Sequence, residues 1–322
     1  MKKTLWVLLD SRTGSVGQAR GVVQQLNPEN YDISEKILEY TKLSGLPNFL
    51  RGKTLIGLSP ESKKQIAAPF PDMVLSTSRR TVPVARFIKK QNRATKLIQL
   101  MHPGRTGLKE FDLALVPEHD KNKISYPNIK YIVGAPHRMT PKALNDAEQV
   151  WAPRFADLPK PLTAVVVGGA IKGKEFSLEN AAELGKKIKE LKQKIGGSVL
   201  ITTSRRTGAK AEKTIMDAIA GIPAYTFLWG DKKENPYVGY LACADNIVVT
   251  GDSVSMCCEA CGTGKPVFVF TGRHWLTRKH IRFIASLYKN GYAAALKSYN
   301  LNFKPKARLN AAVDAAKFID EL

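Results

Sequence analysis

The sequence predicts an α/β protein made of two Rossmann-like domains, and three observations lead to this prediction. Short apolar runs alternate with helical patterns along the chain, which is typical of parallel sheets joined by helical crossovers. The series starts again after Pro159-Lys160-Pro161, and the motif Thr-Ser-Arg-Arg-Thr occurs once in each half, at 77–81 and at 203–207. A chain of 322 residues is also long enough for two domains of ordinary size.

We expect an N-terminal domain over 1–158, a C-terminal domain over 159–303, and a helix within 304–322 that packs back across the joint. The predicted strands are 4–9, 73–77, 95–101, 111–116 and 129–133 in the first domain, and 162–167, 198–203, 224–228, 246–250 and 266–270 in the second. The predicted helices are 16–26, 83–91 and 141–150, then 178–194, 209–220, 237–243, 254–262 and 277–289.

The composition indicates an anionic partner. The chain carries 50 Lys and Arg against 28 Asp and Glu, a formal charge of +22, with an ordinary hydrophobic content of 43%. Such a charge suits nucleic acid, an acidic membrane surface or phosphorylated small molecules. No nucleic-acid-binding motif accompanies it, and aromatic residues make up only 8%, so we expect no nucleic-acid partner.

The first apolar run, 4–9, is too short for a signal peptide, and no run is long enough to span a bilayer. We therefore expect a cytoplasmic protein, with peripheral binding to the inner membrane as an option. Segment 43–58 is apolar, contains glycines and is flanked by basic residues. It suits either an interfacial segment on anionic lipid or a buried connection.

Segment 250–266 has the parts of a nucleotide site. An apolar run leads into Gly251-Asp252-Ser253, and a helical pattern with an internal carboxylate, Glu259, follows. Backbone N–H groups at a helix start bind phosphate, and Glu259 lies where it could accept hydrogen bonds from ribose hydroxyls. Ser255 and Met256, in the first helical turn, are further binding candidates. The alternative is an ordinary strand–turn–helix unit in which Asp252 or Ser253 is only the N-cap.

Two glycine pairs are further candidates for the approach of a phosphate. Gly14 and Gly17 follow the first strand, and Gly168-Gly169 follow the first strand of the second half. The first pair does not form G-x-G-x-x-G, and no acidic residue ends a clear second strand about 20 residues later. NAD is therefore disfavoured, and no cofactor is expected.

The two Thr-Ser-Arg-Arg-Thr motifs each follow an apolar strand and precede a helical pattern. Their hydroxyls, helix-start amides and guanidinium groups match phosphate oxygens, and both would line one cleft if the two sheets face one another. This makes candidates of Arg79, Arg80, Ser204, Arg205 and Arg206. The alternative is that both motifs are solvated helix starts.

Trp229 could cover a nucleobase or could be a partly exposed packing residue. His102, Glu118 and His119 follow strands of the first domain and are candidates for a general base, although each His could instead be bonded to the backbone of its own loop. The four cysteines lack a second ligand cluster, so we expect buried thiols and no metal site.

Several motifs together resemble the mitochondrial fission family named for the plant "elongated mitochondria" phenotype. They are Asp10-x-Arg-x-Gly-x-x-Gly-Gln, the Thr-Ser-Arg-Arg-Thr pair, Val-Pro-Glu-His-Asp, Gly134-Ala-Pro-His-Arg and Thr250-Gly-Asp-Ser-Val-Ser-Met-x-x-Glu-Ala, and the resemblance covers about residues 4–300. It implies a fold similar to GT-B glycosyltransferases, with two Rossmann-like domains around a cleft and a nucleotide-sugar donor held by the second.

This resemblance implies a metal-independent glycosyltransferase that moves a sugar from a nucleotide-sugar to an envelope or lipid-linked acceptor on the first domain. The alternative is a non-catalytic, membrane-associated adaptor that retains the fold and binds a protein partner.

Overall fold

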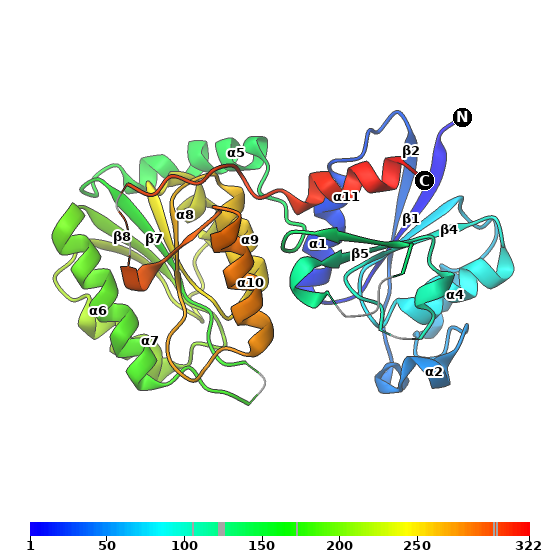
Figure 1. Cartoon of the computed structure of the whole chain (residues 1–322), viewed down its shortest axis with the longest axis horizontal. Coiled ribbons are helices and arrows are strands. Elements are labelled where there is room, and N and C mark those ends of the chain that lie inside the picture. The colour runs from blue at the N-terminus through cyan, green and yellow to red at the C-terminus, as the bar shows by residue number, and fades with distance from the viewer. Residues whose placement is uncertain (105, 122–125, 172, 299, 301) are drawn as a thin grey trace. The chain divides into compact units, whose positions relative to one another are not determined.

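The computed structural model describes residues 1–104, 106–121, 126–171, 173–298, 300 and 302–322. Lys172, which follows the second glycine pair, and Arg105 lie outside the described residues. The chain forms two compact units, which are drawn in Figure 1. Unit 1 combines Met1–Arg138 with Asn310–Leu322, and unit 2 is Met139–Leu309. Each unit holds one six-stranded sheet with parallel neighbours, so the predicted α/β class with two Rossmann-like units is confirmed.

Unit 1 has the strand order β2-β1-β3-β4-β5-β6. Its strands are β1 Lys3–Leu9, β2 Tyr31–Ile37, β3 Met73–Ser76, β4 Lys96–Leu100, β5 Leu113–Pro117 and β6 Ile129–Ile132. Its α-helices are α1 Thr13–Val23, α2 Asn48–Arg51, α3 Pro60–Lys64, α4 Val82–Gln91 and α11 Ala311–Asp320. The edge strand β2 was not predicted, because only Tyr31 of its seven residues is buried and no apolar run marks it.

Alternation along β1 divides the core of unit 1 between two faces. Leu5 and Val7 pack with α1 and α11, whereas Leu8 packs with α4. The C-terminal helix α11 is held in this unit by a row of buried alanines and by the Tyr31 hydroxyl, which donates to Asp320 at 2.7 Å. The predicted helix within 304–322 is therefore part of the first unit's core.

Unit 2 has the strand order β12-β11-β10-β7-β8-β9. Its strands are β7 Leu162–Val166, β8 Ser198–Thr202, β9 Ala224–Phe227, β10 Asn246–Thr250, β11 Val267–Phe270 and β12 Ala294–Ala295. Its α-helices are α5 Pro141–Trp151, α6 Leu178–Ile195, α7 Ala209–Ala218, α8 Tyr237–Cys243, α9 Val254–Gly262 and α10 Arg278–Lys289. Helices α6 and α7 cover one face of this sheet, and α9 and α10 lie on the other (Figure 1). The order reverses between β7 and β10, the position at which doubly wound sheets bind ligands.

The division between the units differs from the predicted boundary at 158/159 and lies about 20 residues earlier. Helix α5 belongs to unit 2, where Trp151 packs on Gly239 of α8 and Phe155 makes an edge contact with Tyr225. The Pro-rich stretch lies inside unit 2 as well, since the Pro161 carbonyl accepts from the Ser198 N–H. The prolines mark a turn before the buried strand β7, whereas the boundary between the units lies before α5.

In the part of the chain that the structure describes, no helix is long and apolar enough to cross a membrane. The four cysteines are buried and form no disulfide. Among the same residues, no group of three or more His, Cys, Asp or Glu side chains could hold a metal ion.

Candidate functional site

The crevice at the carboxyl ends of β7 and β10 is built by hydrogen bonds between the loops that follow these two strands. The Gly168 N–H donates to the Thr250 hydroxyl at 2.7 Å, and the Gly169 N–H donates to Oδ2 of Asp252 at 2.8 Å. Two stretches more than 80 residues apart in the chain thus meet at the point where the strand order reverses.

Gly168 and Gly169 are required by contacts within the protein. A Cβ at Gly168 would overlap the carboxylate of Asp252, and one at Gly169 would overlap the backbone of Arg206 and Thr207. The absence of side chains lets the β7, β8 and β10 loops approach one another. Whether this pair also lets a diphosphate approach stays a prediction.

Asp252 orients one of the predicted arginines. Its side chain is fully buried, and its carboxylate lies 2.9 Å from Nη1 of Arg206, which also donates to the Ala170 carbonyl at 2.9 Å. Burial raises the pKa of Asp252, while the Gly169 N–H, Thr250 and Arg206 oppose this shift. Since the Arg206 side chain is 37% exposed, its guanidinium is fixed at the mouth of the crevice with part of its surface open.

The second Thr-Ser-Arg-Arg-Thr loop is tied to the same crevice. The Ser204 hydroxyl donates to the Gly168 carbonyl at 2.8 Å, and the Thr207 hydroxyl donates to the same carbonyl. Arg205 is exposed and makes no hydrogen bond or ion pair with a described residue. The loop therefore presents one anchored guanidinium and one that extends into solvent.

The N-terminus of α9 lies directly after Asp252. Ser253 is its N-cap, and the Ser253 hydroxyl accepts from the Met256 N–H at 3.4 Å, so the predicted capping role is observed. No described residue accepts from the N–H groups of Val254 or Ser255. Two unpaired N–H groups and the positive end of a helix form a suitable place for an anion.

Glu259 lies farther along α9 and is half-buried. Its Oε2 accepts from the Tyr237 hydroxyl at 2.5 Å, a partner on α8 that sequence reasoning missed. Burial raises the pKa of Glu259, and the Tyr237 hydrogen bond opposes the shift. The second oxygen, Oε1, has no partner among the described residues, which leaves it open to a ligand hydroxyl.

Trp229 follows β9 at the same edge of the sheet. Trp229 is among the most exposed large apolar residues of the chain, at 62%. Its backbone N–H donates to the Thr203 hydroxyl at 2.8 Å. The backbone is thus anchored and the indole ring is available to solvent or to a base.

His280 is a titratable residue of this crevice that sequence reasoning missed. It lies in the first turn of α10, where its Nδ1 is 2.7 Å from the Thr277 hydroxyl. Burial lowers the pKa of His280, and the nearby Asp252 opposes that shift. Its position after β11, at the edge where the other loops gather, is the signal that could have revealed it.

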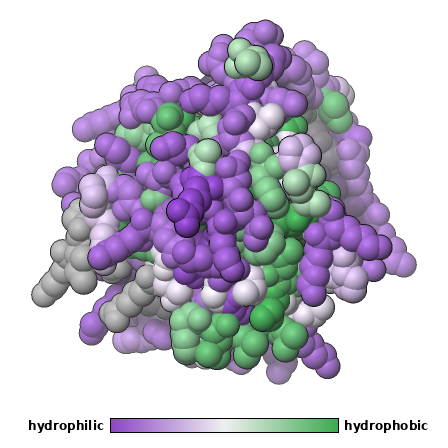
Figure 2. Space-filling model, turned by 90° about the vertical axis from the view of Figure 1, so that its right-hand side faces the viewer, coloured by the Kyte–Doolittle hydropathy of each residue, from purple (hydrophilic) through white to green (hydrophobic). Residues whose placement is uncertain are grey.

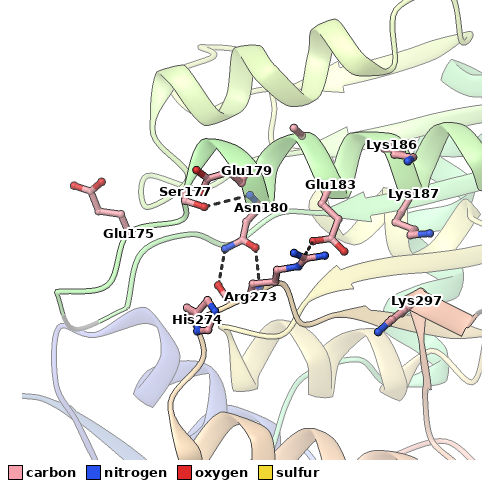
Figure 3. A pocket seen from close by; sticks show the side chains of 11 residues that line it. Glu175, Ser177, Glu179, Asn180, Glu183, Lys186, Lys187, Arg273, His274 and Lys297 are labelled. Carbon is pink, nitrogen blue, oxygen red and sulfur yellow. Dashed lines mark hydrogen bonds and ion pairs between the residues drawn. The ribbon is translucent and has the colours of Figure 1, made fainter.

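An open pocket of about 900 Å³ lies beside this crevice in unit 2 (Figure 3). Its walls are the N-terminal half of α6 and the loop after β11, and Asn180 joins them by accepting from the Arg273 N–H at 2.8 Å. The pocket contains three glutamates and four cationic side chains, and none of the predicted site residues lines it. The same loop contacts the crevice through Trp275, whose indole N–H donates to the Gly169 carbonyl at 3.1 Å. We take the crevice as the candidate site because its donors converge, whereas the charges of the pocket are mixed.

The first-unit candidates lie at the carboxyl edge of the other sheet, in separate places. Gly14 and Gly17 lie inside α1, which begins at Thr13 rather than at the predicted 16. Arg79 is exposed, and Arg80 lies over the Tyr40 ring at 5.7 Å. A Cβ at Gly17 would meet open space, so packing does not require glycine there.

The three candidates for a general base differ in accessibility. His102 Nδ1 accepts from the Gly104 N–H at 3.0 Å, which is the loop role that the sequence left open. His119 is only 4% exposed, so its burial argues against the predicted contact with an acceptor. Glu118 is exposed and follows β5 directly.

Comparison with known structures identifies the fold. A UDP-GlcNAc 2-epimerase from Methanocaldococcus jannaschii aligns with a TM-score of 0.57 at 10% identity, covering 99% of each chain. The enzyme from Neisseria meningitidis, solved with UDP-GlcNAc, aligns at 0.54 and 15%, covering 99% of this chain and 98% of that one. Acinetobacter baumannii MurG aligns at 0.54 and 12%, covering 99% and 100%. The chain therefore has the GT-B-like fold that the resemblance implied.

Sequence relatives identify the family. An uncharacterised protein of Rickettsia prowazekii (strain Madrid E) is 29% identical over 316 residues, covering 88% of this chain and 87% of that protein. The mitochondrial fission protein ELM1 of Arabidopsis thaliana is 31% identical over 226 residues, covering 63% of this chain and 52% of the plant protein, so the match spans about half of its length. The family model described as mitochondrial fission ELM1 matches residues 13–322, and the chain belongs to this family.

Proposed function

We propose that this protein is a metal-independent glycosyltransferase that takes a sugar from a nucleotide-sugar and transfers it to an envelope or lipid-linked acceptor. The observation that carries the proposal is the crevice of unit 2. There the unpaired N–H groups of Val254 and Ser255 lie two and three residues after Asp252, which holds the Arg206 guanidinium. This combination suits the diphosphate of a donor.

Each residue of the crevice has a role in this proposal. The N-terminus of α9, Arg205 and Arg206 stabilise the charge that develops on the leaving diphosphate. Oε1 of Glu259 accepts from a ribose hydroxyl, and Trp229 stacks on the base. Asp252 acts as a positioning residue, because its carboxylate faces Gly169 and Arg206 inside the protein.

The similar structures suggest which nucleotide to test first. The Neisseria meningitidis epimerase was solved with UDP-GlcNAc, so uridine diphosphate is the first probe. Glu118 and His102 remain candidates for deprotonating the acceptor hydroxyl.

The alternative is an adaptor without catalytic activity that is bound at a membrane surface. It is favoured by the name of the plant relative, a mitochondrial fission protein. The Arg206–Asp252 ion pair also fits it, because a guanidinium that is already paired has less charge to offer a ligand.

Thermal shift with a panel of nucleoside diphosphates tests the proposal. At about 1 mM, one nucleotide should raise the melting temperature measurably, since a ligand that binds only the folded state stabilises it by mass action. Glu259→Ala should abolish the shift. Tyr237→Phe is the matched control, because it removes the same internal hydrogen bond and keeps the carboxylate.

A second pair of variants tests turnover of the donor. The rate of hydrolysis of the nucleotide-sugar should fall at least about tenfold in Arg205→Ala. Arg79→Ala, the corresponding change in the other Thr-Ser-Arg-Arg-Thr loop, should leave this rate unchanged. If no nucleotide at this concentration stabilises the protein, the transferase proposal fails and the adaptor is favoured.

A further inference from the structure

An exposed apolar patch lies on unit 1, far along the chain from the crevice of unit 2. It consists of Leu43, Leu46, Phe49, Leu50 and Ile56, all of them exposed large hydrophobic residues. Phe49 and Leu50 are 67% and 60% exposed. Figure 2, which faces unit 1, shows hydrophobic residues gathered at the lower edge, at the height of α2 in Figure 1. Five such side chains within 14 residues are a concentration that marks an interaction surface.

The patch stands on a closed loop whose ends are joined. The Thr41 N–H donates to the Gly57 carbonyl at 2.9 Å, and Tyr40 pairs with Leu58 in an antiparallel bridge. Two polar residues of the loop point inward: Asn48 and Arg51 are buried and donate to the carbonyls of Arg79 and Arg80. The apolar side chains are therefore held outward by a backbone that is anchored from behind.

The charge around the patch is positive. From Tyr40 to Pro60 the chain has three cationic residues and no Asp or Glu. Lys42 is exposed and makes no ion pair with a described residue, while Lys53 pairs with Glu110. The short helix α3, which follows, adds the exposed residues Lys63 and Lys64 and one exposed acid, Glu61. Its Ser62 hydroxyl accepts from the Glu39 N–H at the base of the loop.

We propose that the apolar patch inserts into the interface of a membrane that contains anionic lipid. Aliphatic and aromatic side chains on a projecting loop enter the boundary between head groups and acyl chains, and lysines around them contact lipid phosphates. The formal charge of +22 draws the whole chain toward such a surface. A protein partner would have to cover the same patch with an acidic, apolar surface of its own.

This docking also brings lipid head groups close to the first Thr-Ser-Arg-Arg-Thr loop. Asn48 and Arg51 join the back of the patch to the backbone of Arg79 and Arg80. If the proposed transferase function holds, a lipid-linked acceptor is presented beside this loop. The docking itself does not depend on nucleotide binding.

Co-sedimentation of the full chain with vesicles tests the proposal. The protein should bind phosphatidylcholine vesicles that contain phosphatidylglycerol and bind poorly to phosphatidylcholine alone. The double variant Phe49→Ser/Leu50→Ser should lose at least about tenfold in partitioning, because it removes two of the five inserted side chains. Lys42→Glu should weaken binding about threefold or more, and added salt should shrink this difference.

The matched control is Val150→Ser/Leu178→Ser, which removes two comparably exposed apolar side chains from unit 2. It should bind within about twofold of the wild type. All four side chains are exposed, so the variants should keep the thermal stability of the wild type. The proposal is overturned if the wild type does not bind the anionic vesicles or if the Phe49/Leu50 variant binds as the wild type does. Nucleotide added to the vesicles should not change either result, which separates a failure of docking from a failure of the proposed function.

Discussion

The two Thr-Ser-Arg-Arg-Thr loops have the same local structure in different surroundings. In each, the N–H of the serine donates to the hydroxyl of the last threonine, at 3.2 Å for Ser78 and 3.0 Å for Ser204. In each, the serine hydroxyl accepts from the N–H of the second arginine at 3.2 Å. Five residues of identical sequence therefore close the same small turn after a buried parallel strand.

What the second arginine does is decided by its neighbours. Arg80 lies over the ring of Tyr40 in unit 1. Arg206 in unit 2 is held by Asp252 and by the Ala170 carbonyl. A local motif therefore specifies a turn, whereas the electrostatic role of its side chains depends on residues far away in the sequence.

The largest expected difference between the units concerns their glycines. Gly168→Ala should destabilise unit 2 by about 3 kcal/mol or more, because the new methyl group overlaps the Asp252 carboxylate and disrupts its bonds to Gly169 and Arg206. Gly17→Ala should stabilise unit 1 by about 0.5–1 kcal/mol, since it lies inside α1 with open space beyond its Cα. Urea denaturation measures both. Equal effects at the two positions would show that the crevice of unit 2 is not packed as described.

A smaller difference is expected for the second arginines. Arg206→Ala leaves the buried Asp252 carboxylate without its ion-pair partner and should cost about 1–3 kcal/mol, reduced by the partial exposure of Arg206. Arg80→Ala loses only the contact with Tyr40 and should cost about 0.5–1 kcal/mol. The same denaturation experiment compares them, and a cost for Arg80→Ala as large as that for Arg206→Ala would contradict the different roles of the two arginines.

The smallest effect is a difference in pH dependence with opposite signs in the two units. Burial raises the pKa of Asp252, so the folded chain keeps that proton where the unfolded chain has lost it, and the contribution of Asp252 to stability falls as pH rises above about 4. The Asp252→Asn variant has no titrating group at this position. Its free energy of unfolding, relative to that of the wild type, should therefore rise over that range, by at most about 1.4 kcal/mol per pH unit.

Asp112 in unit 1 supplies the opposite case. Burial acts to raise its pKa, but the Leu97 N–H and Lys89 outweigh burial and lower it. Its contribution to stability is present above about pH 4 and is lost as pH falls below that value. The free energy of unfolding of Asp112→Asn, relative to that of the wild type, should therefore fall as pH rises through this lower range. Denaturation midpoints from pH 3 to 7, as differences from the wild type, measure both variants. If the stabilities of the two variants, relative to the wild type, change with pH in the same direction, the opposite pKa shifts of Asp252 and Asp112 are refuted.

Most of the sheet and helix order was predictable because each buried strand is a short apolar run with turn residues on either side. The exceptions have physical causes. Strand β2 is an edge with one buried residue, and β12 is two residues long and exists through its pairing with β11. The boundary between the units could not be read from proline content, since α5 packs on α8 by contacts that composition does not reveal.

The parts of the candidate site that depend on neighbouring residues were predictable, whereas the contacts between distant segments of the chain were not. Gly251, Asp252 and Ser253 were recognised as a helix start from their order alone, and Ser253 is the N-cap. The partners Tyr237 and His280 were missed, because nothing near Glu259 or Asp252 in the sequence points to α8 or α10.

The sequence by itself therefore determined the alternation of strands and helices, the turn of each Thr-Ser-Arg-Arg-Thr loop and the start of α9, since these depend on contacts within a few residues. Only the tertiary structure decided that Asp252 pairs with Arg206, that Gly168 must lack a side chain and that five apolar residues of unit 1 face outward. The reason is that burial and close approach depend on segments brought together by the sheet, whose order in space differs from their order in the chain.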